Sequence, residues 1–167
     1  TTFSIVGLNG WNVSSAIDMS SMLLETGRYA TTWSIGDLSG WRTSSAEDMD
    51  WMFSSTGSST TSWTIGNLSN WDTASAKNME SMFSAAGSNA SSFNLGNLGS
   101  WDVSKVENMS YMFNSAGSYS TSWNIGDLSN WNVSEVTNMS GMFAGDASNA
   151  SSFNIGNLSN WDTRKVT

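Results

Sequence analysis

Two aspartates at a fixed spacing are the residues of this sequence that could form a catalytic pair. Asp72 and Asp102 lie 30 residues apart, and each directly follows a tryptophan. On neighbouring strands their carboxylates would lie ~5 Å apart, which is the separation found in retaining glycosidases. The equivalent positions carry Arg42 and Asn132, and the chain has no histidine that could act as a base. We therefore favour a solvated column of side chains, and we predict that the protein is not an enzyme.

Composition also limits metal and cofactor chemistry. The chain contains no cysteine and no histidine, so disulfides, zinc sites and thiol nucleophiles are excluded. Serine is abundant, but a serine without a general base is not a nucleophile. A calcium site in the aspartate column is an alternative, although no Asp-x-Asp-x-Asp-Gly loop occurs. We predict no metal and no cofactor.

The residues at the aspartate position are our first candidate for a binding surface, because repeat proteins bind along extended faces. This outward column comprises Asn12, Arg42, Asp72, Asp102, Asn132 and Asp162. Trp51 and Tyr111 occupy another position, which is Ser or Gly elsewhere. We expect both rings to reach solvent and to contact a glycan or a partner.

Two rows of hydroxyl side chains are a further candidate surface. The first hydroxyl row comprises Thr1, Thr31, Thr61, Ser91, Thr121 and Ser151, and the second comprises Thr2, Thr32, Ser62, Ser92, Ser122 and Ser152. In a regular stack both rows recur at one strand spacing and could organise water as an ice-binding surface does. Serine replaces threonine freely in both rows, whereas a surface that matches the ice lattice would need to retain the threonine methyl group. We therefore favour a polar return loop.

A strict 30-residue repeat must position all of these side chains. Tryptophan recurs at Trp11, Trp41, Trp71, Trp101, Trp131 and Trp161. A fixed period predicts stacked copies of one unit, each burying its apolar face against its neighbours. The tryptophans could form a sugar-stacking surface, but each shares its side with Val or Thr and lies near columns of Ile and Leu, so we favour a buried ladder.

Spacing within each repeat predicts one short strand and one short helix, and hence an α/β solenoid with coils of about 30 residues. Trp71 and Thr73 are two residues apart, so both point to one side of an extended segment. The apolar residues at positions 76, 79, 82 and 83 have the spacing of a helical turn. Helix starts would be capped by Asp18, Asp48, Asn78, Asn108 and Asn138, and helix ends by Gly27, Gly57, Gly87 and Gly117.

Two glycine patterns complete the repeat. In the fifth copy Ala147 replaces the helix-ending glycine and Gly145 precedes it, so we expect a locally different turn there. A second corner is marked by Gly36, Gly66, Gly96, Gly126 and Gly156.

Length and charge narrow the possible partners. The 167 residues carry a net charge of −8, which repels phosphate backbones and anionic lipids, so we predict no nucleic-acid partner. No apolar run approaches ~20 residues, so we predict no membrane insertion. Because no linker interrupts the period, residues 1–167 are predicted to form one domain of five full repeats and a partial sixth. Neither end carries a capping repeat, so we expect a piece of a longer protein.

The repeat resembles that of a known bacterial family. Residues 101–113 read Trp-Asp-Val-Ser-Lys-Val-Glu-Asn-Met-Ser-Tyr-Met-Phe, and residues 131–143 read Trp-Asn-Val-Ser-Glu-Val-Thr-Asn-Met-Ser-Gly-Met-Phe. This motif is similar to the repeat of BspA-like leucine-rich-repeat surface proteins over essentially the whole chain. The resemblance implies right-handed leucine-rich-repeat-like coils, an extracellular or cell-surface location, and adhesion to a host or neighbouring-cell protein or glycan. End-to-end self-association through open solenoid ends and ice binding stay open as alternatives.

Overall fold

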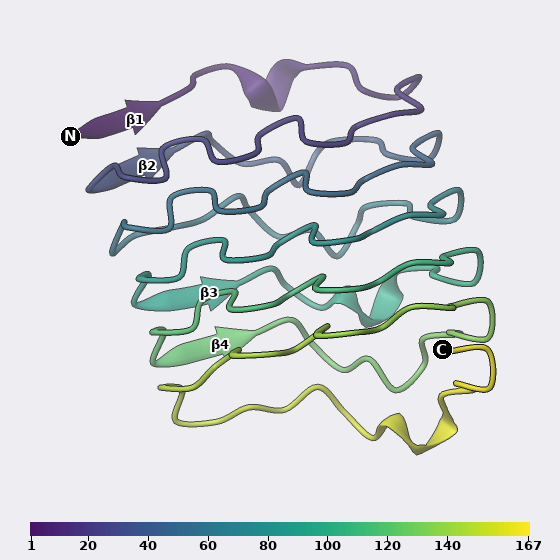
Figure 1. The fold of residues 1–167 in the computed structure, drawn as a ribbon. Coiled ribbons are helices and arrows are strands. Elements are labelled where there is room, and N and C mark those ends of the chain that lie inside the picture. The colour runs from purple at the N-terminus through teal and green to yellow at the C-terminus, as the bar shows by residue number, and fades with distance from the viewer.

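The computed structural model describes all 167 residues as six similar segments lying one above another (Figure 1). We number these repeats 1 to 6, from residues 1–30 to residues 151–167. The assigned elements are the strands β1 (Thr2–Ser4), β2 (Thr32–Ser34), β3 (Ser92–Asn94) and β4 (Ser122–Asn124) and the 3-10 turns η1 (Leu8–Gly10), η2 (Leu98–Ser100) and η3 (Leu158–Asn160). The protein is therefore a mostly non-helical repeat fold with short strands.

Neighbouring repeats pair in parallel with a constant offset of 30 residues. Strand β1 pairs with β2 and β3 with β4, and in each pair the central Phe faces the central Trp. Isolated parallel bridges with the same offset join Asp18 to Asp48 and continue through Asn78 and Asn108 to Asn138. The predicted period is thus also the pairing register of the backbone.

The core is one cluster of 40 buried residues that extends through the repeats. Trp41, Trp71, Trp101 and Trp131 are buried, and the Trp41, Trp71 and Trp101 rings stack at centroid distances of 6.1 and 6.3 Å. The predicted buried ladder is confirmed for these four residues. Trp11, in the first repeat, is 55% exposed.

Each buried indole of this ladder also bonds to the preceding repeat. The Nε1 of Trp101 donates to the carbonyl of Leu68 at 2.9 Å, and the Nε1 of Trp131 donates to that of Leu98 at 2.8 Å. The same bond, always across 33 residues, is made by Trp41, Trp71 and Trp161. One side chain therefore supplies both apolar burial and a directional bond between repeats.

The predicted position of the strand is wrong. Trp71 and Thr73 are buried and Asp72 is exposed, so the inward–outward alternation is as expected, but no strand forms there. The Trp71 amide donates to Leu68 within the same repeat, and the Asp72 carboxylate accepts the amide of Ala74. These local bonds turn the chain, and the assigned strands lie instead around the Phe3, Trp33, Phe93 and Trp123 positions.

The predicted short helix is also wrong. In repeat 3, Ser81, Ala85 and Gly87 adopt left-handed backbone angles, with φ of 52°, 54° and 52°, which a right-handed helix cannot contain. Amides in this segment alternate between two acceptors: Phe83 donates to Met112 in the next repeat, whereas Ala86 donates to Phe83 three residues back. A chain of turns thus replaces the helix and joins the repeats through its backbone.

The predicted caps and glycines keep their positions but stabilise these turns. The Oδ1 atoms of Asp18, Asp48, Asn78, Asn108 and Asn138 each accept the amide two residues later. The expected local change in repeat 5 is wrong, because Gly145 and Ala147 are left-handed like Ser115 and Gly117 one repeat earlier.

The indole bond predicts an unequal effect of one substitution at two equivalent positions. Trp101→Phe removes the bond to Leu68 and part of a buried ring, so we expect a loss of about 1–2 kcal/mol in the free energy of unfolding. Trp11→Phe is the matched control, since Trp11 is exposed and its indole has no protein acceptor. Urea unfolding measures the free energy of unfolding of both variants. Equal losses in the two variants would contradict a stabilising role of the indole bond.

Candidate functional site

The outward column of Asn12, Arg42, Asp72, Asp102, Asn132 and Asp162 lies at the surface, and only Asp162 is half-buried. Its acids and amides cap turns: Asp102 accepts the Ser104 amide at 3.0 Å, and Asn132 accepts that of Ser134 at 3.2 Å. Hydrogen bonds from the Ser104 hydroxyl and amide lower the pKa of Asp102. Those from Arg164 lower the pKa of Asp162 to about 2. A general acid needs a raised pKa, whereas the pKa values of Asp102 and Asp162 are lowered.

Trp51 and Tyr111 reach solvent as predicted, with 38% and 46% of their surfaces exposed. The two rings do not meet, because they belong to repeats 2 and 4 and the intervening residue, Ser81, is buried. The Tyr111 ring lies against Gly141 of the next repeat, where a Cβ would overlap its Cε1. Both aromatic residues have left-handed φ angles, which is rare for large side chains.

The two hydroxyl rows are exposed but differ in their bonding. In the first row the hydroxyls of Thr31, Ser91, Thr121 and Ser151 donate to the carbonyl 30 residues earlier, at 3.0 to 3.4 Å. In the second row the only bond between its members joins Thr32 to Thr2 at 2.9 Å. The first row thus links repeats, whereas the second leaves most of its hydroxyls free.

A third exposed row was missed by the sequence reasoning. It lies two residues beyond the second hydroxyl row, on the other side of the central Phe or Trp of each repeat, and comprises Ser4, Ser34, Thr64, Asn94, Asn124 and Asn154. The period-two alternation around Phe93 and Trp123 was the signal that could have found it. The second hydroxyl row and this third row together face outward from the strands.

The predicted glycine corner borders these rows. Gly36, Gly66, Gly96, Gly126 and Gly156 all have φ between 84° and 91°. At every one of these glycines except Gly36, a Cβ would overlap an oxygen of the preceding repeat: that of Asp37 beside Gly66, Asn67 beside Gly96, Asn97 beside Gly126 and Asp127 beside Gly156. Glycine is required here both for its left-handed angle and for this close approach.

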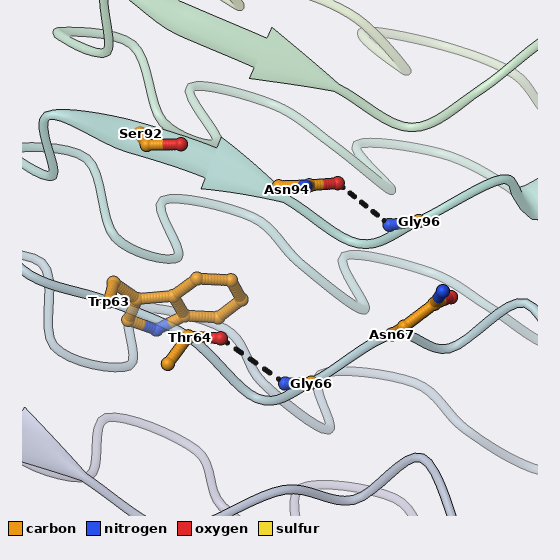
Figure 2. Close-up of a pocket in the computed structure, with 7 residues that line it drawn as sticks. All are labelled: Trp63, Thr64, Gly66, Asn67, Ser92, Asn94 and Gly96. Atoms are coloured by element: carbon orange, nitrogen blue, oxygen red, sulfur yellow. Dashed lines mark hydrogen bonds between the residues drawn. The ribbon is translucent and has the colours of Figure 1, made fainter.

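Three hollows follow the glycine corner, and we call them together the corner groove. The largest, about 400 Å³, is shown in Figure 2 and is lined by Trp63, Thr64, Gly66, Asn67, Ser92, Asn94 and Gly96. A hollow of about 260 Å³ shares Thr64 and Gly66 with it. A third, of about 390 Å³, lies in the same register between repeats 5 and 6.

Hydroxyl and carboxamide groups line the corner groove. The Thr64 hydroxyl accepts the Gly66 amide at 3.3 Å, and Asn94 Oδ1 accepts the Gly96 amide at 2.9 Å (Figure 2). The Asn94 Nδ2 has no acceptor in the protein. No Lys or Arg lines any of the three hollows. The groove therefore offers hydrogen-bond donors and acceptors with no positive charge.

One further hollow, of about 300 Å³, contains a residue of the outward column. It is lined by Ser134, Glu135, Asp162, Arg164 and Lys165. Its charges are paired, because Arg164 contacts Asp162 and Lys165 contacts Glu135, each at 2.6 Å. No set of three acidic side chains converges in an arrangement that could hold a metal ion, and no helix is long and apolar enough to cross a membrane.

Segments of 30 residues stacked in one register define a tandem-repeat protein. The chain belongs to the family described as Mycoplasma protein of unknown function, DUF285, which matches residues 1–86, 28–127 and 88–167. These tandem matches confirm its repeat character. No curated protein and no solved structure matches the chain.

Asp146 is a half-buried acid outside these surfaces. Its Oδ1 accepts the Ala116 amide at 2.9 Å, whereas its Oδ2 is enclosed without a hydrogen-bond partner. Desolvation by burial raises the pKa of Asp146 to about 8, and no charged neighbour contributes. We therefore expect the ionisation of Asp146 to change the stability of the folded protein.

The raised pKa of Asp146 predicts a pH-dependent substitution effect. With a pKa of about 8 in the folded protein and ~3.9 in the unfolded chain, the folded state binds more protons between these values. The stability that depends on this group therefore falls as pH rises through that window. We expect the Tm of Asp146→Asn to exceed that of the parent only slightly near pH 5, and this difference to be about 2–8 °C larger near pH 9.

Asp127→Asn is the control for this thermal-melting measurement. Hydrogen bonds from Ser129 lower the pKa of Asp127, so it stays ionised throughout the window. An equal gain in Tm for Asp146→Asn at both pH values would refute the raised pKa assigned to Asp146.

The glycine corner predicts a second pair of unequal effects. Gly96→Ala forces a side chain into a left-handed angle and against Asn67, so we expect a loss of about 1–3 kcal/mol in the free energy of unfolding. Gly40→Ala is the control, because Gly40 has open space around it and no left-handed angle. Similar unfolding midpoints for the two variants would show that the corner tolerates a Cβ.

Proposed function

We propose that the chain is a right-handed solenoid of the leucine-rich-repeat kind, similar to BspA-like surface proteins. The constant 30-residue register and the tandem family matches support this proposal. We further propose that it acts outside the cell or on a cell surface as a non-enzymatic module for adhesion. Its partner is then a protein or glycan of a host or neighbouring cell.

The observation that carries the binding role is the corner groove. Its hollows recur in the same register on one face, whereas no hollow lies along the outward column except beside Asp162. We therefore propose the corner groove, in place of the column, as the binding surface.

Two double variants with the same change in net charge test this assignment. Thr64→Lys with Asn94→Lys fills the largest hollow with long side chains, and Asp72→Asn with Asp102→Asn alters the outward column. The parent and both variants are applied to immobilised panels of glycans and extracellular-matrix proteins. We expect the groove variant to lose at least about tenfold in affinity and the column variant to bind like the parent.

If the column variant lost affinity and the groove variant bound like the parent, the outward column would be the binding surface. Absence of parent binding to every glycan and protein in the panels would refute the adhesion proposal. Thermal melting of both variants distinguishes lost binding from lost folding.

A further inference from the structure

The corner groove follows the direction in which repeats stack, but in two separate parts. Between repeats 4 and 5 the Asn124 Nδ2 donates to the Asn94 Oδ1 at 2.9 Å, and no hollow lies there. Its first two hollows share Thr64 and Gly66, so they connect repeats 2, 3 and 4. The third hollow repeats the same positions between repeats 5 and 6, with Asn124 and Asn154 in place of Thr64 and Asn94. A ligand that follows the groove would cross successive repeats rather than run along one of them.

The repeat distance of the groove limits the kind of polymer that could follow it. Neighbouring strands in a parallel pair lie ~4.7–4.9 Å apart. The rings that stack between neighbouring repeats lie 5.0 to 6.3 Å apart. An extended peptide advances ~3.3 Å per residue and would fall out of step with the lining groups. In a linear polysaccharide with extended linkages, each sugar could lie opposite one repeat and meet the same set of groups.

The charge of the groove limits the ligand further. Asp37 and Asp127 border its hollows, and hydrogen bonds from Ser39 and Ser129 lower the pKa of each, so both are ionised at neutral pH. With a net charge of −8 on the chain, sulfated or uronic-acid polymers would be repelled. Hydroxyl groups suit this lining, because they can donate to carboxylates and accept from the free Asn94 Nδ2.

Apolar recognition contributes little here. The only apolar residue in the largest hollow is Trp63, which is 5% exposed and stacks at 5.7 Å on Trp33 and at 5.0 Å on Phe93. Its faces are therefore covered by other rings, and no indole surface is open for stacking on a sugar. Binding in the groove would depend on hydrogen bonds spread over many repeats.

We infer that the ligand of the corner groove is an unbranched, uncharged polysaccharide that lies parallel to the stacking direction, with one sugar opposite each repeat. This inference rests on the proposed binding role and adds the ligand class and its orientation. The two connected hollows span repeats 2, 3 and 4, so they provide three neighbouring subsites.

A length series tests the inference. Cello-, xylo- and N-acetylchito-oligosaccharides from two to six sugars are titrated into the whole chain by calorimetry. In at least one series we expect the Kd to fall about three- to tenfold from two sugars to three, with no comparable gain for each sugar beyond the third. Affinity that is independent of length beyond the disaccharide, or tighter binding of a uronic-acid oligomer, would overturn the inference.

Single substitutions along the groove test the orientation. Thr64→Ala in repeat 3 should weaken both the two-sugar and the three-sugar ligand, because repeat 3 lines both connected hollows, whereas Ser34→Ala in repeat 2 should weaken only the three-sugar ligand. Equal effects of both variants on every length would contradict an axial chain. If the chain binds only proteins in the panels described above, this inference fails and the adhesion proposal stands.

Discussion

The indole N–H of each tryptophan in the buried ladder donates to a leucine carbonyl of the preceding repeat, and this bond imposes the constraint on which the structure depends. A repeat that slipped by one residue would lose the bond and also turn its apolar positions outward. The same 30-residue offset governs the strand pairs, the bridges from Asp18 to Asn138 and the stacked rings. Side chains of one type therefore form rows, and any surface property recurs in every repeat.

The period, the buried ladder and the stacked arrangement could be predicted from the sequence, because they follow from residue identity at a fixed spacing. The strand and the helix could not. Trp71 and Thr73 alternate like a strand, but the Asp72 carboxylate captures a local amide and turns the chain. The apolar residues after Ala76 have a helical spacing, yet Ser81 and Ala85 are left-handed, and their own amides donate to carbonyls of the next repeat. Bonding between repeats thus overrides local propensity.

At the candidate surfaces, the solvent exposure of side chains was easier to predict than the shape of the surface. Trp51 and Tyr111 reach solvent, as their exchange for Ser or Gly in other repeats suggested. The corner groove was missed, although its glycines had been recognised as a corner. The groove depends on which oxygen of the preceding repeat lies beside each glycine, as Asn67 does at Gly96, and that neighbour is fixed only by the register in space. A groove lined by many weak hydrogen-bonding groups suits an extended polymer better than a small molecule.

Hydrogen exchange of the tryptophan indole N–H groups, followed by NMR, tests the bond between repeats most directly. Buried, bonded N–H groups exchange only when the surrounding structure opens. The account predicts slow exchange for Trp71, Trp101 and Trp131 and rapid exchange for the exposed Trp11. Indoles that all exchange as fast as that of Trp11 would contradict it.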